Sequence, residues 1–377
     1  MLRRIMLLAA ALTLGLWLTI ASASQPRTEE ANAALDYIIG LQNPDGGFPA
    51  FGDESTPGST LDALFALKAA HLVELAVEGL PSPTGDALDY LSTQANSYAA
   101  DPGAAAKLAL GAALFNRDLS DFGGVNLLSI MAGAVDPETA AYGLDLFDEC
   151  LYLLAQAALD APVPEATYQH LHSSRAVDGG WEFTPGSGSD TNTTAMVVQA
   201  LVAADAPADD HAVQVALGYL RTAQNDDGGF GFLPGEDSDP NTTALVIQAI
   251  VAAGRDVEAD PYVRNGKTPL DALAAFQNPA TGAIQFFGED SAFASYQAVP
   301  ALLLAPFPGL EPREVAGPTP EAPTAIESTP AATAASTPAL PDAGAGPDGG
   351  GAAWLLAALL AAGGAIGIGS AVARRRG

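Results

Sequence analysis

The segment "QNDDGGFGFLPGEDSDPNTTALVIQAI" (residues 224–250) joins a polar turn and an acidic loop directly to a long apolar run. The same order of Asp-Gly-Gly-aromatic turn, polar loop and apolar run recurs in residues 45–70 and 178–204, and a degenerate copy covers residues 278–305. The two best copies begin at Asp178 and Asp227, 49 residues apart. A repeat of this length predicts an array of similar units that bury their apolar faces against one another.

Each copy predicts a helical hairpin. An amphipathic stretch precedes the turn, at residues 34–42, 169–176, 215–224 and 270–277. We expect its helix to stop at the glycine pair, because glycine readily adopts the left-handed conformation that ends helices. The aromatic residue then packs inward, and a Ser, Thr, Asp or Asn caps the helix that follows. That second helix is apolar on nearly all sides, so protein must surround it, with the amphipathic helices as an outer layer.

The middle of the chain keeps this alternation of amphipathic and apolar stretches in residues 87–115, 125–135 and 147–163. Counting these stretches gives about six hairpins between Ala31 and Pro306, with few strand signals. Six hairpins with inner and outer helices can close into a ring, and a closed ring needs no capping repeats. The predicted fold class is therefore all-α, an α/α toroid that forms one domain over residues 25–310.

The two ends of the chain predict export and anchoring. Residues 1–23 are typical of a signal peptide, with an uncleaved N-terminal anchor as the alternative. Residues 311–350, rich in Pro, Thr and Ala, predict a disordered stalk. Residues 352–373 predict one transmembrane helix, and the basic tail at 374–377 predicts a cytoplasmic C-terminus. We expect the domain on the extracellular face of the membrane, or on the cell wall if a sortase cuts at "LPDAG" (340–344) and removes the anchor.

The net charge limits the class of binding partner, and the cysteine content limits how the domain can be stabilised. The formal net charge is −29 at pH 7, and nucleic acid is a poor partner for so acidic a protein. Cys150 is the single cysteine, so the domain has no intrachain disulfide and must be stabilised by packing alone.

The repeated turns carry a resemblance to a known family. The turns that begin at Gln42 and Gln224, and the one at Asp178 without the glutamine, resemble the QW-type repeats of terpene cyclases and protein prenyltransferases. The segments "SDTNTTA" and "SDPNTTA" are similar to the DxDD-T-A segment of squalene–hopene cyclases. This resemblance implies the α/α toroid, which transcobalamin and intrinsic factor share. It does not by itself imply a function, because one fold hosts unrelated activities.

The chain departs from the cyclase motif where the chemistry occurs. In the cyclases the middle aspartate of DxDD protonates the substrate, and the resemblance places Asn192 and Asn241 at that position. An amide has no acidic proton to give. We therefore expect a ligand-binding or interaction module that is not an enzyme. An isoprenoid-processing enzyme (terpene cyclase or prenyltransferase) and a structural or adhesive spacer with a filled ring are the alternatives.

The inner helices of such a ring begin at one mouth, so the sequence predicts a ligand-binding rim there. Its polar residues are Asp190, Asn192, Gln199, Asp239, Asn241 and Gln248. Helix capping alone is the competing explanation for the aspartates and asparagines. The two glutamines lie in apolar helices and require a partner in a neighbouring repeat or in the cavity. A corrinoid, an isoprenoid or a glycan fits such a cavity, and the sequence leaves the choice open.

Metal binding is a further alternative. Asp148 and Cys150 have the D-x-C spacing of the zinc ligands in prenyltransferases, and His211 supplies a third ligand type. The simpler interpretation of Cys150 is a small buried apolar residue. Clustered carboxylates outside the cell leave calcium open. No other cofactor is predicted.

Overall fold

The computed structural model describes residues 24–72, 81–207 and 209–307. The predicted signal peptide, stalk, transmembrane helix and basic tail lie outside these residues. Within them, no helix is both long enough and apolar enough to cross a bilayer.

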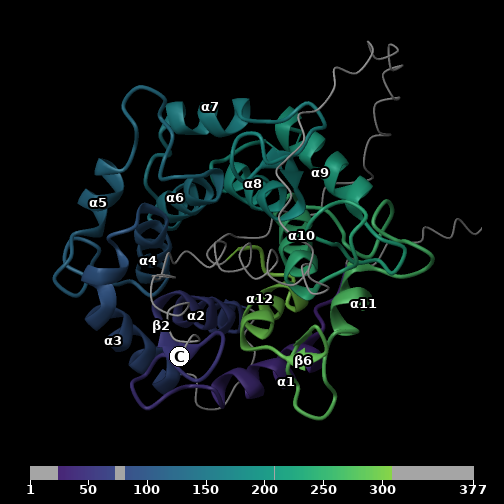
Figure 1. Ribbon diagram of the computed structural model, residues 1–377, viewed down its shortest axis with the longest axis horizontal. Coiled ribbons are helices and arrows are strands. Elements are labelled where there is room, and N and C mark those ends of the chain that lie inside the picture. The colour runs from purple at the N-terminus through teal and green to yellow at the C-terminus, as the bar shows by residue number, and fades with distance from the viewer. Residues whose placement is uncertain (1–23, 73–80, 208, 308–377) are drawn as a thin grey trace, which may run out of the picture.

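Six inner helices form a closed ring (Figure 1). Each packs against the next, and the last packs against the first. The predicted ring of about six hairpins is therefore confirmed, and an open superhelix is excluded. The inner helices are α2 (Pro57–Leu72), α4 (Pro102–Leu114), α6 (Leu146–Ala158), α8 (Thr191–Ala203), α10 (Pro240–Ala252) and α12 (Ala292–Leu302).

Among the described residues, six outer helices surround this ring, one beside each step (Figure 1). The amphipathic pattern is clear in α9, which buries Val213, Leu217 and Leu220 against the inner layer. The predicted two-layer arrangement is confirmed. The outer helices are α1 (Thr28–Ile39), α3 (Pro81–Tyr98), α5 (Leu127–Gly133), α7 (Glu165–Ser173), α9 (His211–Ala223) and α11 (Pro269–Ala274).

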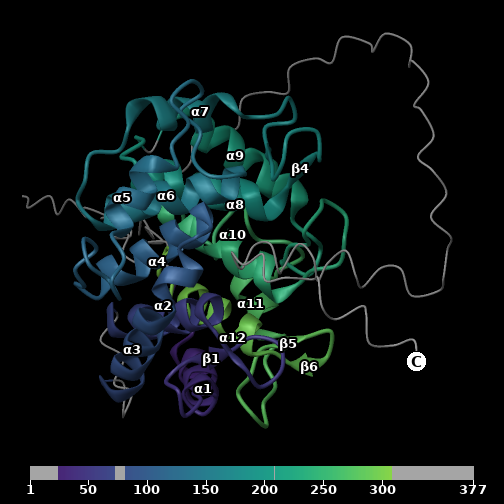
Figure 2. The same cartoon turned by 60° about the vertical axis from the view of Figure 1, so that its left-hand side comes forward.

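Three short antiparallel hairpins lie in the turns between outer and inner helices. They pair β1 (Phe48–Pro49) with β2 (Ser55–Thr56), β3 (Trp181–Glu182) with β4 (Ser189–Asp190), and β5 (Gln285–Phe286) with β6 (Glu289–Asp290). Figure 2 shows the turns that carry β4, β5 and β6 on the same side of the ring.

A repeated hydrogen bond fixes each turn to its inner helix. The aromatic residue after the glycine pair is fully buried at Phe48, Trp181 and Phe230, as predicted. Its backbone N–H donates to a hydroxyl one turn into the inner helix, at 2.9–3.0 Å; the acceptors are Thr60, Thr194 and Thr243. The degenerate copy keeps the bond, with Ser295 as the acceptor.

The prediction that the glycine pair ends the outer helix is wrong. Helices α1, α7 and α9 end several residues before their pairs. The first glycine instead has a φ of +79° to +91°, and a Cβ placed on it would lie 2.3–2.7 Å from the next outer helix or its capping residue. The glycine therefore permits the close approach of neighbouring repeats. This holds for Gly46, Gly179, Gly228 and Gly282.

The ring closes where the last repeat meets α1. A Cβ on Gly282 would lie 2.3 Å from the backbone oxygen of Ala33 in α1. Arg27, just before α1, pairs with Glu258 at 2.9 Å and with Asp271 at 2.8 Å, and its backbone N–H donates to the carbonyl of Leu302. The seam thus uses the same glycine contact as the other repeats, reinforced by two ion pairs.

The inner helices are parallel and begin with side-chain caps. Asp101, Asp145, Asp190, Asp239 and Ser291 each accept a hydrogen bond from a backbone N–H in the first turn of α4, α6, α8, α10 and α12. Such caps satisfy N–H groups that lack a partner within the helix. The predicted capping is confirmed. Outer and inner helices alternate along the chain, so the inner helices run in the same direction and begin at one mouth of the ring.

Candidate functional site

Two members of the predicted rim are helix caps. The Asp190 carboxylate accepts from the backbone N–H of Thr193 at 2.7 Å, and Asp239 accepts from that of Thr242 at 2.8 Å. Burial raises the pKa of Asp190 to about 6 and also raises the pKa of Asp239. Capping accounts for the position of both carboxylates.

The two asparagines at the cyclase acid position differ from the caps. Asn192 and Asn241 lie two residues after Asp190 and Asp239, in equivalent places at the starts of α8 and α10. Their side-chain carbonyl oxygens are buried and accept no hydrogen bond from the described residues. Within the predicted rim, these amides are the groups whose hydrogen-bonding capacity the fold leaves unused.

The two glutamines bind the segment that follows α12. The backbone N–H of Phe307 donates to Gln199 Oε1 at 2.7 Å, and Gln248 Nε2 donates to the carbonyl oxygen of Ala305 at 3.4 Å. The Phe307 ring packs edge-on against Phe65 of α2, 5.5 Å between centroids. Helices α2 and α8 face each other across the ring (Figure 1), so residues 303–307 enter the hub. The partner of the glutamines is thus internal.

The residues of the zinc alternative each have another place in the fold. Asp148 accepts from the backbone N–H of Leu144 at 2.9 Å. Cys150 is fully buried in α6, and His211 begins α9. Burial raises the pKa of the Cys150 thiol, which disfavours the thiolate that zinc needs. In residues 24–72, 81–207 and 209–307, no three His, Cys, Asp or Glu side chains form a group that could hold a metal ion.

A buried ion pair that the sequence did not reveal joins two inner helices. Asp62 of α2 lies 2.8 Å from Lys107 Nζ of α4, and Lys107 also donates to the carbonyl oxygen of Gly58 at 3.2 Å. Both side chains are buried, and burial raises the pKa of Asp62 while Lys107 opposes the shift. The signal in the sequence is a charge inside a mostly apolar helix: Asp62 in α2, which also carries Lys68, and Lys107 as the single charge of α4.

A pocket of about 370 Å³ lies between α6, α7 and the β3–β4 turn. This volume is at the small end of the range for small-molecule sites. The pocket combines apolar walls with three carboxylates and one imidazole. Its lining residues are Ala141, Tyr142, Gly143, Leu144, Asp145, Leu146, Glu149, His170, Ser174, Glu182 and Pro185.

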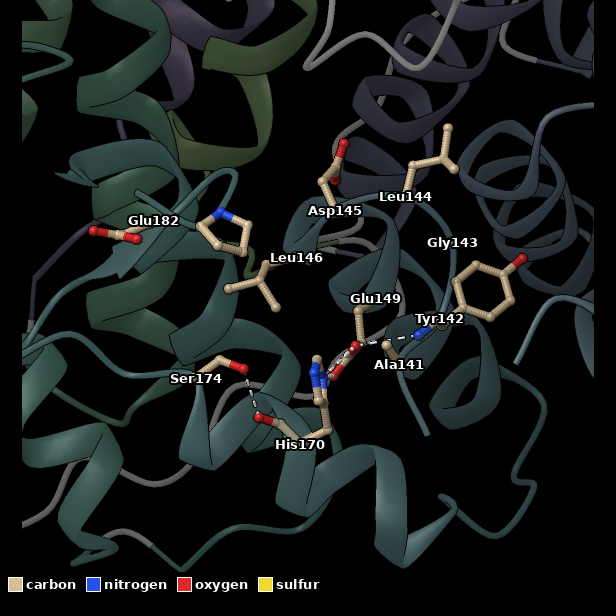
Figure 3. Close-up of a pocket in the computed structure, with 11 residues that line it drawn as sticks. Ala141, Tyr142, Gly143, Leu144, Asp145, Leu146, Glu149, His170, Ser174 and Glu182 are labelled. Carbon is tan, nitrogen blue, oxygen red and sulfur yellow. Dashed lines mark hydrogen bonds and ion pairs between the residues drawn. The ribbon is translucent and has the colours of Figure 1, made fainter. Parts of the chain in front are cut away.

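The floor of this pocket is a Glu–His pair (Figure 3). His170 Nδ1 lies 2.9 and 3.1 Å from the two carboxylate oxygens of Glu149, which also accepts from the backbone N–H of Tyr142 at 3.2 Å. The Glu149 side chain is 1% exposed. Burial raises its pKa, and the hydrogen bond from His170 opposes that shift. The sequence reasoning missed this pair, because its two members lie on helices of different hairpins.

Comparison with known proteins agrees with the fold. Residues 4–97 and 146–276 match the family described as the prenyltransferase alpha-alpha toroid domain, which covers more than half of the chain. The chain therefore belongs to this family. No curated protein matches the sequence.

Several solved structures share the toroid. The substrate-free type II terpene cyclase MstE from Scytonema has 15% identity and a TM-score of 0.56, over 74% of this chain and 97% of that one. A protein from Actinoplanes has 12% identity and a TM-score of 0.54, over 74% and 99%. The GH76A alpha-1,6-mannanase from Salegentibacter sp. HEL1_6 has 9% identity and a TM-score of 0.56, over 74% and 98%. Cyclases and glycosidases thus share this fold, and identities this low show the fold alone.

Proposed function

We propose that the toroid is a ligand-binding or interaction module that does not catalyse cyclisation. The observation that carries the proposal is the occupied hub, where Gln199 and Gln248 hold residues 305–307 and Phe307 packs against Phe65. A polyene cyclase needs that space for its substrate. The amides of Asn192 and Asn241 support the same conclusion, because cyclisation requires a titratable acid in that place.

Two buried acids of the inner helices, Asp62 and Glu149, are already engaged. Lys107 neutralises Asp62 at 2.8 Å, and Glu149 is bound by His170. Neither carboxyl group takes the place of the missing acid, because each would first have to break its pair. A protonating role therefore has no free donor at these two positions.

The test is product formation by the full-length protein in detergent. The protein is incubated with squalene and with geranylgeranyl dihydroxybenzoate, which is a substrate bound by MstE in a solved structure. We expect no cyclised product by mass spectrometry, either from the wild type or from Phe307→Ala, which opens space but supplies no acid. Cyclised product from the wild type above the protein-free blank would refute the proposal.

We further propose that the module is displayed outside the cell. The apolar residues 352–373 followed by three arginines support a single-pass anchor with a cytoplasmic C-terminus. Protease added to intact cells should remove the toroid and leave an epitope tag at the C-terminus protected. Protection of the toroid with digestion of the tag would reverse the assignment.

A structural or adhesive spacer is the second candidate function, and the occupied hub favours it as well. The two functions differ in whether the toroid recognises a small ligand at all. A ligand site outside the hub decides between them.

A further inference from the structure

The pocket between α6 and α7 lies outside the hub, since its lining includes the outer helix α7 and the β3–β4 turn. Residues 303–307 therefore do not fill it. Its chemistry is acidic and rich in acceptors: Asp145, Glu149 and Glu182 line it, and no Lys or Arg does. Such a lining repels phosphates and carboxylates and attracts positive charge.

The imidazole of His170 gives the pocket a directed contact. Its Nδ1 is held by the buried carboxylate of Glu149 at 2.9 Å, whereas Nε2 has no partner in the described part of the chain. When Nδ1 carries the proton of the neutral ring, Nε2 presents a lone pair. A buried carboxylate behind the ring strengthens this acceptor. The pocket thus offers an acceptor at its floor for a ligand N–H.

The rim carboxylates keep capacity for a charged ligand. Asp145 uses one oxygen for the backbone N–H groups of Phe147 and Asp148, and Glu182 uses one oxygen for that of Gly186. The second oxygen of each carboxylate makes no hydrogen bond to the described residues. Figure 3 shows the two carboxylates well apart from each other. They therefore make the electrostatic potential negative at two places on the rim.

The remaining wall is apolar. Ala141, Leu144, Leu146 and Pro185 line it, and Leu144 is 77% exposed. A large exposed apolar side chain at the edge of a pocket adds area that a ligand can cover. A bare metal ion does not fit this wall, and the described residues contain no group of three metal-ligating side chains. The complementary ligand has a compact apolar body and a protonated amine.

We propose that this pocket binds a small organic ammonium ion, whose N–H donates to His170 Nε2 while Asp145 and Glu182 attract its charge. The proposal rests on the binding function proposed above and names the ligand class of that function. It also distinguishes a recognition module from a spacer.

The experiment is a titration of the full-length protein in detergent with cyclohexylamine and with its neutral isostere cyclohexanol. Binding is followed by saturation-transfer NMR of the probe, which serves every variant, and in the wild type also by NMR of the histidine ring nitrogens. A seven-heavy-atom probe is expected to bind with a dissociation constant on the order of 1 mM. Cyclohexanol is expected to bind at least about tenfold more weakly, because it lacks the charge. Equal binding of the two probes, or no binding of cyclohexylamine, overturns the proposal.

Two variants locate the site. His170→Asn keeps a donor at the Nδ1 position for Glu149 but removes Nε2, and it should weaken cyclohexylamine binding about tenfold or more. Glu182→Gln, at the rim, should weaken it about two- to fivefold, as expected for a partly exposed charge. The matched control Glu138→Gln changes a carboxylate that does not line the pocket, so binding should stay unchanged. Unaltered binding in both pocket variants overturns the proposal. If one variant folds poorly, unaltered binding in the other overturns it.

The outcomes separate this inference from the proposed function. Failure of cyclohexylamine to bind, with no cyclised product in the polyene assay, removes the ammonium site and leaves the non-catalytic module. Cyclised product refutes the proposed function whatever the amine does.

Discussion

Replacing Asp148 by Asn should remove part of the pH dependence of the free energy of unfolding. Asp148 lies in the first turn of α6, packed against Gly103 and Gly143, with its carboxylate on the backbone N–H of Leu144. Burial, and next the negative charge of Asp145, raise its pKa from 3.8 to about 7. Between these values the folded protein holds a proton that the unfolded chain has released. The free energy of unfolding therefore falls as the pH rises through this window.

The size of the effect follows from the shift. One pKa unit corresponds to about 1.4 kcal/mol, so a rise of about three units costs on the order of 4 kcal/mol by pH 8. Partial solvent screening reduces this to about 2–4 kcal/mol. Asn has the same shape, keeps an acceptor for the N–H of Leu144 and does not titrate. The stability of Asp148→Asn relative to the wild type should therefore increase by that amount between pH 4 and pH 8.

The assay is urea unfolding of the full-length protein, followed by circular dichroism at several pH values. Asp136→Asn is the matched control of opposite sign. Asp136 is exposed and accepts from the backbone N–H groups of Thr139 and Glu138, which lower its pKa. Its replacement should be more destabilising at neutral than at acidic pH. If Asp148→Asn and the wild type keep a constant difference from pH 4 to pH 8, the electrostatic reasoning is refuted.

Three further changes test the repeat and the hub. Thr194→Val removes the acceptor for the buried aromatic N–H of its repeat, so it should lower the free energy of unfolding by about 1–3 kcal/mol in the same assay; a neutral effect would contradict the role of that hydroxyl. Gly282→Ala should cost clearly more than Gly288→Ala, because both have positive φ but only the first meets a neighbouring backbone; equal midpoints would remove the contact from the explanation. Gln199→Leu should increase hydrogen exchange at the Phe307 amide by about tenfold, because that N–H loses its acceptor; unchanged exchange would show that the glutamine does not hold the segment.

The fold was predictable because its signal is repeated. The Asp-Gly-Gly-aromatic turns and the apolar runs after them each specify a hairpin, and four copies agree with one another. The role of Gly46 and Gly282 was not predictable, because their constraint comes from a neighbouring repeat rather than from the helix before them. The rule that glycine ends helices uses only neighbouring residues in the sequence, so it cannot predict a contact between two repeats.

The candidate site was only partly predictable. Capping explained Asp190 and Asp239 from their position alone, and the requirement that Gln199 find a partner was correct. That partner, however, is a backbone 108 residues away that no pattern marks. The Glu149–His170 contact is equally tertiary, since it exists only once α7 is laid against α6.

The parallel inner helices have an electrostatic consequence. Each helix start carries roughly half a positive charge from its aligned peptide dipoles, so six starts at one mouth concentrate about three positive charges there. Dipoles that run side by side in the same direction repel one another. The capping carboxylates of Asp101, Asp145, Asp190 and Asp239 stand at those ends and offset the repulsion. At four of the six inner helices, a capping carboxylate therefore favours the shared direction around the ring.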